Sequence, residues 1–186
     1  GVAMGRVYPG VRKLLGELRE NGFALGVATQ KPEGIANTVL AAHGLSASFD
    51  IIAGSSDDET LMPGDPGYRS GKTEIIAAAL VGLDRPAAVP GSAAPAALMV
   101  GDRAQDVNGA RGNALDCVGV CWGFALPGEL EAAGAVAVVD HADGLLAEIR
   151  HRLGGMDTLR TARLTAGLSA ASGTGPHAGE AAGGSL

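Results

Sequence analysis

The feature that most constrains the fold of this chain is a regular alternation of short apolar runs with amphipathic segments. Apolar runs bounded by turn residues predict strands, and apolar residues at helical spacing predict helices. The predicted strands are residues 23–28, 49–53, 96–100, 116–121 and 136–139, and the predicted helices are 11–20, 32–43, 71–83, 105–113, 128–133 and 142–153. Strands that alternate with helices indicate a parallel sheet. We therefore predict an α/β fold, a Rossmann-like parallel sheet with helices on both faces.

The chain is expected to divide into a core of residues 1–153 and a disordered tail of residues 154–186. The tail consists largely of Gly, Ala, Ser and Thr, has no aromatic residue and shows no lasting periodicity. Such a segment cannot bury enough apolar surface to offset the entropy of ordering it. The remaining length suits one domain.

The charge and hydropathy of the chain exclude several classes of partner. The formal net charge of −6 and the isoelectric point of about 5.1 give no general attraction to nucleic acid. No apolar run approaches the ~20 residues that span a bilayer, and the start has no basic segment followed by an apolar one. We therefore expect a cytoplasmic protein without a nucleic-acid or membrane partner. Cys117 and Cys121, four apart on an apolar stretch, are interpreted as two buried thiols.

Polar residues that follow the apolar runs are the candidates for a binding site. In a doubly wound sheet, ligands bind where the carboxyl ends of the strands meet the loops that follow them. The candidate residues at these strand ends, or at a helix start, are Thr29, Gln30, Lys31, Lys72, Asp102, Arg103 and Asp106. Asp102 and Asp106 stand four apart across a strand-to-helix turn, which can bring both carboxylates to one side of the helix N-terminus. Hard oxygen ligands of this kind suit Mg²⁺.

Each of these residues also has a simpler interpretation when it is taken alone. Asp102 can be a helix N-cap, and Thr29 can cap the helix that begins near Pro32. Lys72 can be a solvated lysine in a polar loop. Together they favour one shared binding site instead. A hydroxyl, a lysine and a Gly-Asp-x-x-x-Asp segment follow one another in this order, and each lies at a strand end or a helix start.

Several segments resemble the motifs of a known enzyme superfamily. The segments Val27–Pro32, Gly71–Lys72 and Val100–Ala110 resemble the second, third and fourth motifs of the haloacid dehalogenase-like hydrolases. Four further segments make the resemblance closer to the phosphoglycolate phosphatase-like branch, namely Tyr8–Val11, Gly119–Gly123, Glu129–Leu130 and Ala133–Gly134. The similarity extends from Tyr8 to Leu153, and Gly-Asp-Arg-x-x-Asp at the end of an apolar strand is its most specific part.

The resemblance implies a Mg²⁺-dependent hydrolysis of a phosphate monoester through an aspartyl-phosphate intermediate. It implies that Thr29 binds the transferring phosphoryl group and that Lys72 neutralises charge on it. Asp102 would hold the metal directly, and Asp106 directly or through water. Phosphoryl transfer depends mostly on positioning and electrostatic stabilisation, which a lysine and a divalent cation supply. The expected contacts to the substrate, a small phosphorylated metabolite, are Gln30, Lys31 and Arg103.

The sequence departs from this family in one respect that bears on activity. The family's first motif, Asp-x-Asp-x-Thr at the end of the first strand, supplies the nucleophile and the general acid/base, and no segment here matches it. In the family this strand lies in the middle of the sheet, between the strands that carry Thr29 and Asp102, and a helical cap follows it. We therefore expect the central strand and the cap to be missing, which would leave the flanking strands with open inner edges.

Three interpretations of this gap remain open. In the first, the chain is the C-terminal portion of an intact phosphatase and is itself an inactive fragment, which the start at Gly1 without an initiator Met favours. In the second, the chain is complete and non-catalytic, and its phosphate and metal pocket has a regulatory or binding role. In the third, the chemistry is that of the superfamily's carbon–halogen hydrolases, which use no metal, and the carboxylate pair argues against it.

Overall fold

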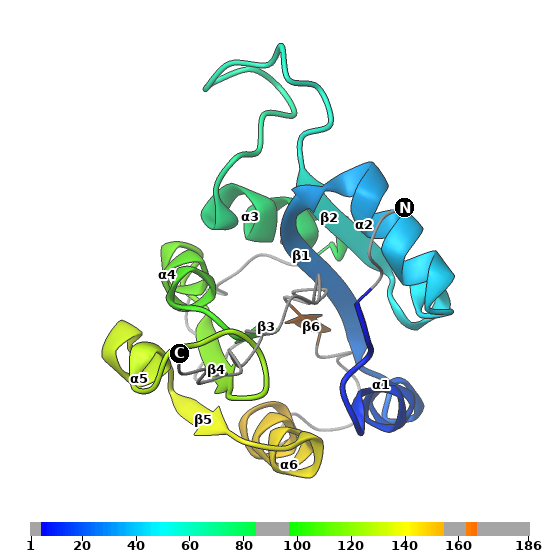
Figure 1. The fold of residues 1–186 in the computed structure, drawn as a ribbon, viewed down its shortest axis with the longest axis vertical. Coiled ribbons are helices and arrows are strands. Elements are labelled where there is room, and N and C mark those ends of the chain that lie inside the picture. The colour runs from blue at the N-terminus through cyan, green and yellow to red at the C-terminus, as the bar shows by residue number, and fades with distance from the viewer. Residues whose placement is uncertain (1–4, 85–96, 155–162, 167–186) are drawn as a thin grey trace, which may run out of the picture.

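Six parallel strands form a single sheet in the part of the chain that the computed structural model describes, residues 5–84, 97–154 and 163–166 (Figure 1). Their order across the sheet is β2-β1-β6-β3-β4-β5, and every neighbouring pair is parallel. The strands are β1 Ala24–Pro32, β2 Ile51–Ser55, β3 Ala97–Gly101, β4 Asp116–Val120, β5 Ala137–Val139 and β6 Arg163–Ala166. The predicted α/β fold with a parallel sheet is confirmed.

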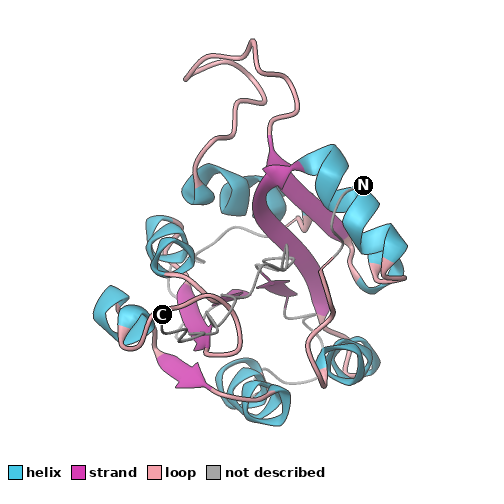
Figure 2. Ribbon diagram, viewed as in Figure 1, coloured by secondary structure: helices cyan, strands magenta, loops and turns pink. Residues whose placement is uncertain are grey.

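Helices cover both faces of this sheet, as Figure 2 shows. α1, α2 and α6 lie on one face, and α3, α4 and α5 lie on the other. The helices are α1 Val11–Glu20, α2 Glu33–Ala42, α3 Lys72–Gly82, α4 Ala104–Gly112, α5 Glu129–Ala133 and α6 Ala142–Leu153, with a short 3₁₀ turn at Ser46–Ser48. Within the described ranges, no helix combines the length and the apolar character that crossing a membrane requires.

The sequence locates the element boundaries to within two residues, except for one that the structure moves further. β1 continues through Thr29 to Pro32, four residues beyond the predicted end at Ala28. The extension arises because the pairing with β2 resumes at Pro32 and Ser55 after an irregularity beyond Ala28. The polar residues after Ala28 are therefore held by the strand itself rather than by a loop. The loop predicted at 85–95 lies outside the described residues.

Two apolar layers, one on each face of the sheet, make up the core. Successive residues of β3 alternate between them, because strand side chains point to opposite faces. Leu98 and Val100 pack in one layer, and Ala97 and Met99 pack in the other. Both layers consist mainly of Leu, Ile, Val and Ala, as a chain so poor in aromatic residues requires.

The two cysteines differ in environment, so the prediction of two buried thiols is wrong for one of them. Cys117 is buried inside β4, whereas Cys121 is exposed. The strand ends at Val120, so Cys121 lies outside the sheet at its carboxyl edge. Burial raises the pKa of the Cys117 thiol to about 12.

The centre of the sheet is filled by a strand from the C-terminal region, which corrects the expectation of open inner edges. β6 lies between β1 and β3 and pairs with both (Figure 1). Its four residues belong to the segment predicted to be a disordered tail, and the structure describes them as a strand. The rest of that tail, apart from Gly154, lies outside the described residues. The physical reason is that two facing strand edges present unpaired backbone N–H and C=O groups, which one inserted strand satisfies on both sides.

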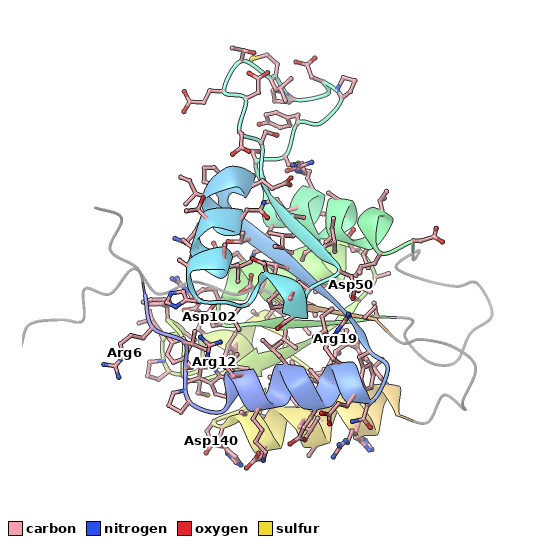
Figure 3. The ribbon with its side chains drawn as sticks, turned by 90° about the vertical axis from the view of Figure 1, so that its right-hand side faces the viewer. Arg6, Arg12, Arg19, Asp50, Asp102 and Asp140 are labelled. Atoms are coloured by element: carbon pink, nitrogen blue, oxygen red, sulfur yellow. The ribbon has the colours of Figure 1, made fainter. Side chains whose placement is uncertain are left out.

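An ion pair fixes the start of β2 against the first helix. Asp50 Oδ2 accepts hydrogen bonds from Leu25 N at 2.8 Å and from Arg19 Nη1 at 2.6 Å. Arg19 and Asp50 lie beside each other at the end of α1 in Figure 3. This contact joins α1 to the sheet edge formed by β1 and β2.

A second ion pair anchors the long connection that follows β2. Arg69 Nη2 lies 2.8 Å from Glu33 Oε2, and Arg69 Nε donates to Gly54 O at 3.0 Å. The loop of residues 56–70 extends away from the sheet and returns at this anchor to α3 (Figure 1). The anchor fixes where α3 begins, and its first residue is Lys72.

Candidate active site

A pocket at the carboxyl edge of β1 and β3 brings the predicted site residues together. It has a volume of about 270 Å³ and is lined by Thr29, Gln30, Lys31, Lys72, Asp102, Arg103, Gln105 and Asp106. All seven residues singled out in the sequence therefore surround one space, although they come from β1, from the start of α3, from the connection between β3 and α4 and from the first turn of α4. Gln105 lines the pocket as well, and sequence reasoning missed it.

Lys72 and Asp106 form a buried ion pair in the wall of this pocket. Lys72 Nζ lies 2.7 Å from Asp106 Oδ1, and the two side chains are 9% and 4% exposed. Lys72 Nζ also donates to Ala28 O at 2.9 Å. Asp106 Oδ2 accepts hydrogen bonds from the backbone N–H groups of Asp102 at 3.0 Å and Arg103 at 3.1 Å. Lys72 is therefore not a solvated surface lysine, and both oxygens of Asp106 are engaged.

Asp102 is buried beside this pair, and the loop after β4 holds its carboxylate. Phe124 N donates to Asp102 Oδ2 at 2.9 Å. A Cβ on Gly123 would lie 2.1 Å from the same oxygen, so a glycine is needed for the loop to approach this closely. Burial raises the pKa of Asp102, the Phe124 hydrogen bond opposes this shift, and the charge of Asp106 adds to it. Asp102 is not the N-cap of α4, because that position belongs to Arg103.

The donors around Asp102 fit a hard divalent cation. Burial disfavours the charge of this carboxylate, and the neighbouring Lys72 is already paired with Asp106. A divalent ion held by Asp102 and water would offset the buried charge, and Mg²⁺ usually takes only one or two carboxylates from a protein. Among the described residues, no three or more His, Cys, Asp or Glu side chains converge as a metal site. The side chains in place could therefore supply part of a Mg²⁺ shell.

Thr29 presents a hydroxyl to the pocket from the buried part of β1. The residue is 6% exposed, and its Oγ1 accepts a hydrogen bond from Lys31 N at 3.2 Å. A hydroxyl that accepts one bond still has its own proton to donate. Thr29 does not cap α2, whose N-cap is Pro32. Its hydroxyl is thus placed to donate to a ligand.

The remaining predicted residues form the more exposed part of the lining. Gln30 is exposed and Lys31 is half-buried. The Arg103 side chain is 43% exposed. These positions at the pocket mouth are compatible with substrate contacts, and that role stays a prediction.

Glu129 is a further polar residue of this region. The sequence indicated it only through the family resemblance, in the segment Glu129–Leu130. Its carboxylate accepts hydrogen bonds from Arg103 Nε, Ala104 N and Leu126 N. These donors lower the pKa of Glu129 to about 2, and the Ala104 N–H contributes most. A glutamate at the start of a helix is a visible signal, but two of its three partners, Ala104 and Arg103, lie 25 and 26 residues away along the chain and leave no local pattern.

Among the described residues, none brings a carboxylate into the pocket in the role of the family's nucleophile. The carboxylates among its lining residues are Asp102 and Asp106, which come from the metal-binding motif of the resemblance. The central strand β6, Arg163–Ala166, contains neither Asp nor Glu. The described residues thus form a site with binding groups and without the expected nucleophile.

Comparison with known proteins shows similarity over most of the chain. The model of a haloacid dehalogenase-like hydrolase family matches residues 2–113, which include every residue of the pocket. The chain is 36% identical to the tyrosine-protein kinase PtkA of Mycobacterium tuberculosis over 154 residues, which are 83% of this chain and 47% of PtkA. It is 35% identical to a plasmid phosphoglycolate phosphatase of Cupriavidus necator over 142 residues, 76% of this chain and 55% of that protein.

Solved structures agree with these sequence matches. The fold superposes on the crystal structure of a predicted phosphatase from Clostridium acetobutylicum with a TM-score of 0.67 and 36% identity, over 78% of this chain and 61% of that one. The chain spans about half the length of the curated relatives it matches. The activities of those longer relatives can therefore only be proposed for this chain.

Proposed function

Because the chain belongs to the haloacid dehalogenase-like hydrolase family, we propose that its pocket binds the phosphoryl group of a small phosphate monoester together with Mg²⁺. The observation that carries this proposal is that Thr29, Lys72, Asp102 and Asp106, from three separate segments, line one pocket. The similarity to two proteins named phosphoglycolate phosphatase supports a whole enzyme of that type.

Each side chain has a distinct role in holding the phosphoryl group. Thr29 donates its hydroxyl proton to a phosphoryl oxygen. Lys72 supplies positive charge, and its bonds to Asp106 and to Ala28 O keep the ammonium group oriented. Asp102 holds the metal, while Asp106, with both oxygens engaged, orients Lys72 and reaches the metal through water. When bound, Mg²⁺ supplies electrostatic stabilisation of the phosphoryl oxygens.

Calorimetric titration with inorganic phosphate in the presence of Mg²⁺ tests this proposal. Wild type should bind phosphate, and Thr29→Val should weaken binding roughly tenfold, because a hydrogen bond to a charged group is lost. Thr38→Val is the matched control, since the Thr38 hydroxyl is exposed on α2 and donates to Gly34 O at 2.9 Å. Absence of phosphate binding by wild type, or equal binding by Thr29→Val, contradicts the proposal.

We further propose that the 186-residue chain does not complete the hydrolysis by itself. The family's reaction through an aspartyl phosphate needs a carboxylate beyond Asp102 and Asp106, and the described residues bring none to the pocket. Hydrolysis of p-nitrophenyl phosphate by wild type should be no faster than by Lys72→Ala. Turnover well above that of the variant would overturn this part of the proposal.

A second candidate is a non-catalytic protein that binds phosphate and metal in a regulatory role. The pairing of β6 with both β1 and β3 favours it, because the described strands leave no gap at the centre of the sheet. Phosphate binding without hydrolysis by the complete product of the gene would support this candidate. Hydrolysis by that complete product would exclude it.

A third candidate is phosphoryl transfer to a tyrosine hydroxyl, which the similarity to PtkA supports. A pocket that holds a phosphoryl group serves hydrolysis and transfer alike, since the two reactions differ in the acceptor. Incubation of the complete gene product with labelled ATP and a tyrosine peptide separates them. Label on tyrosine favours transfer, and release of free phosphate from monoesters favours hydrolysis.

A further inference from the structure

The central strand β6 is shorter than the two strands between which it lies (Figure 1). Its residues Arg163–Ala166 pair in register with residues 24–27 of β1 and 97–100 of β3. β1 continues to Pro32, and β3 continues to Gly101. The inner edges of both neighbours therefore extend past the end of β6, toward the carboxyl edge of the sheet.

The sequence of β6 is unusual for the centre of a parallel sheet. Strands buried on both faces normally consist of apolar residues throughout. The paired segments of β1 and β3, Ala-Leu-Gly-Val and Ala-Leu-Met-Val, follow this rule, whereas β6 is Arg-Leu-Thr-Ala. Arg163 is in register with Ala24 and Ala97, which are 6% and 0% exposed. A segment with Arg and Thr at two of its four positions has less apolar surface to bury than its place in the sheet allows.

Replacement of β6 by another strand costs less than its simple loss. Loss would leave two facing edges of unpaired backbone N–H and C=O groups inside the sheet. A strand that takes its place satisfies the same groups, and a longer apolar strand also adds backbone pairs and buries more apolar surface. Because residues 155–162 join β6 to α6, β6 competes as part of the same chain, at an effective concentration on the order of millimolar.

We propose that the place between β1 and β3 is a strand-binding site, in which a longer apolar strand of a partner polypeptide replaces β6. The buried neighbours specify an apolar partner, and their extension past β6 specifies its greater length. This site adjoins the pocket. Ala166 pairs with Val27 and Val100, and the pocket residues Thr29 and Asp102 each lie two residues further along. A strand that is longer than β6 therefore reaches the floor of the pocket.

Peptide binding to the full chain, without phosphate or Mg²⁺, tests this site. The probe is a fluorescent peptide of about six Val and Leu residues between terminal lysines, which is a usual strand length. The control peptide has a proline in its centre and cannot pair as an internal strand. Fluorescence anisotropy should show that wild type binds the probe and not the control peptide.

Variants of β6 should change the affinity for the probe in opposite directions. Leu164→Pro removes a backbone donor from β6 and should tighten probe binding roughly tenfold or more. Thr165→Val makes β6 more apolar and should weaken probe binding about threefold. Thr38→Val is the matched control on α2 and should bind the probe as wild type does. If neither β6 variant changes the affinity, β6 does not compete for the site.

Hydrogen exchange locates the bound probe. The probe should speed exchange at the amides of residues 163–166 and leave β4 and β5 protected. Probe binding that leaves residues 163–166 protected would mean that the peptide pairs elsewhere, and it would overturn the proposal. Equal binding of both peptides, or no binding of the probe by wild type and by Leu164→Pro, would overturn it as well. A dimer in sedimentation that Leu164→Pro abolishes would make a second copy the occupant and refute a separate partner. Because phosphate is absent throughout, each of these outcomes leaves the proposed function standing.

Discussion

Replacement of Gly123 with alanine tests how closely the loop after β4 must approach Asp102. The new Cβ would lie 2.1 Å from Asp102 Oδ2 and 2.3 Å from Asp102 Cβ. Non-bonded carbon atoms normally stay ~3.5 Å or more apart, so the loop and the carboxylate must separate by roughly 1 Å. Gly123 does not have a positive φ, so the effect comes from crowding rather than backbone strain.

The magnitude follows from the interactions that this separation changes. Crowding of a packed site costs about 1–3 kcal/mol, and the bond from Phe124 N to the charged Asp102 is worth about 1.5–3 kcal/mol. A gain of about 0.4–1 kcal/mol from the stiffer unfolded chain opposes these losses. We expect Gly123→Ala to lower the free energy of unfolding by about 2–4 kcal/mol. Displacing the carboxylate should also weaken Mg²⁺ binding about 10- to 100-fold.

Urea denaturation and calorimetric Mg²⁺ titration measure the two effects separately. Gly16→Ala is the matched control, because Gly16 lies within α1 and no atom lies within 4 Å of a Cβ built there. That variant should be more stable than wild type by about 0.5–1 kcal/mol and bind Mg²⁺ equally well. If Gly123→Ala behaves like Gly16→Ala in both assays, the loop does not hold Asp102 in the way described.

Three further predictions concern buried and titrating groups. Lys72→Met leaves the charge of Asp106 buried without its partner and should lower the free energy of unfolding in urea by about 3–5 kcal/mol. The double variant Lys72→Met/Asp106→Asn should restore part of this loss. Equal stability of the two variants would contradict the ion pair. The pKa of Glu129 is lowered to about 2, so its charge stabilises the fold above the usual pKa of 4.5, and this contribution is lost as the pH falls toward 2. In acid titrations, the stability difference between wild type and Glu129→Gln should therefore shrink between these two pH values and stay constant near neutral pH. Iodoacetamide should modify Cys121 and spare Cys117 in the native chain, as peptide mass spectrometry would show, and modification of both thiols at equal rates would contradict their different burial.

The elements and most of the site were predictable because their signals are local. Apolar runs and helical spacing locate each strand and helix that lies in 5–153, and polar residues that follow a buried strand identify Thr29 and Asp102. The rule that the carboxyl ends of parallel strands meet at one edge then places these residues near Lys72, as the pocket shows.

Features that depend on distant partners could not be predicted in this way. Glu129 acts on residues 25 and 26 positions away, and Gly123 is needed only because the folded loop lies against Asp102. The strand β6 has no hydrophobic pattern that marks it, and backbone groups of its two neighbours determine its place. Cys121 was misjudged because a strand end moved by one residue changes whether a side chain is buried.

Mapping of phosphate by NMR tests the central claim most directly. Backbone amide signals of ¹⁵N-labelled chain are recorded during titration with inorganic phosphate at saturating Mg²⁺. We predict shifts concentrated at residues 29–31, 72 and 102–106, the segments that line the pocket, and their loss in Thr29→Val. Shifts centred elsewhere, or a spectrum that phosphate leaves unchanged, would show that the pocket is not a phosphoryl-binding site.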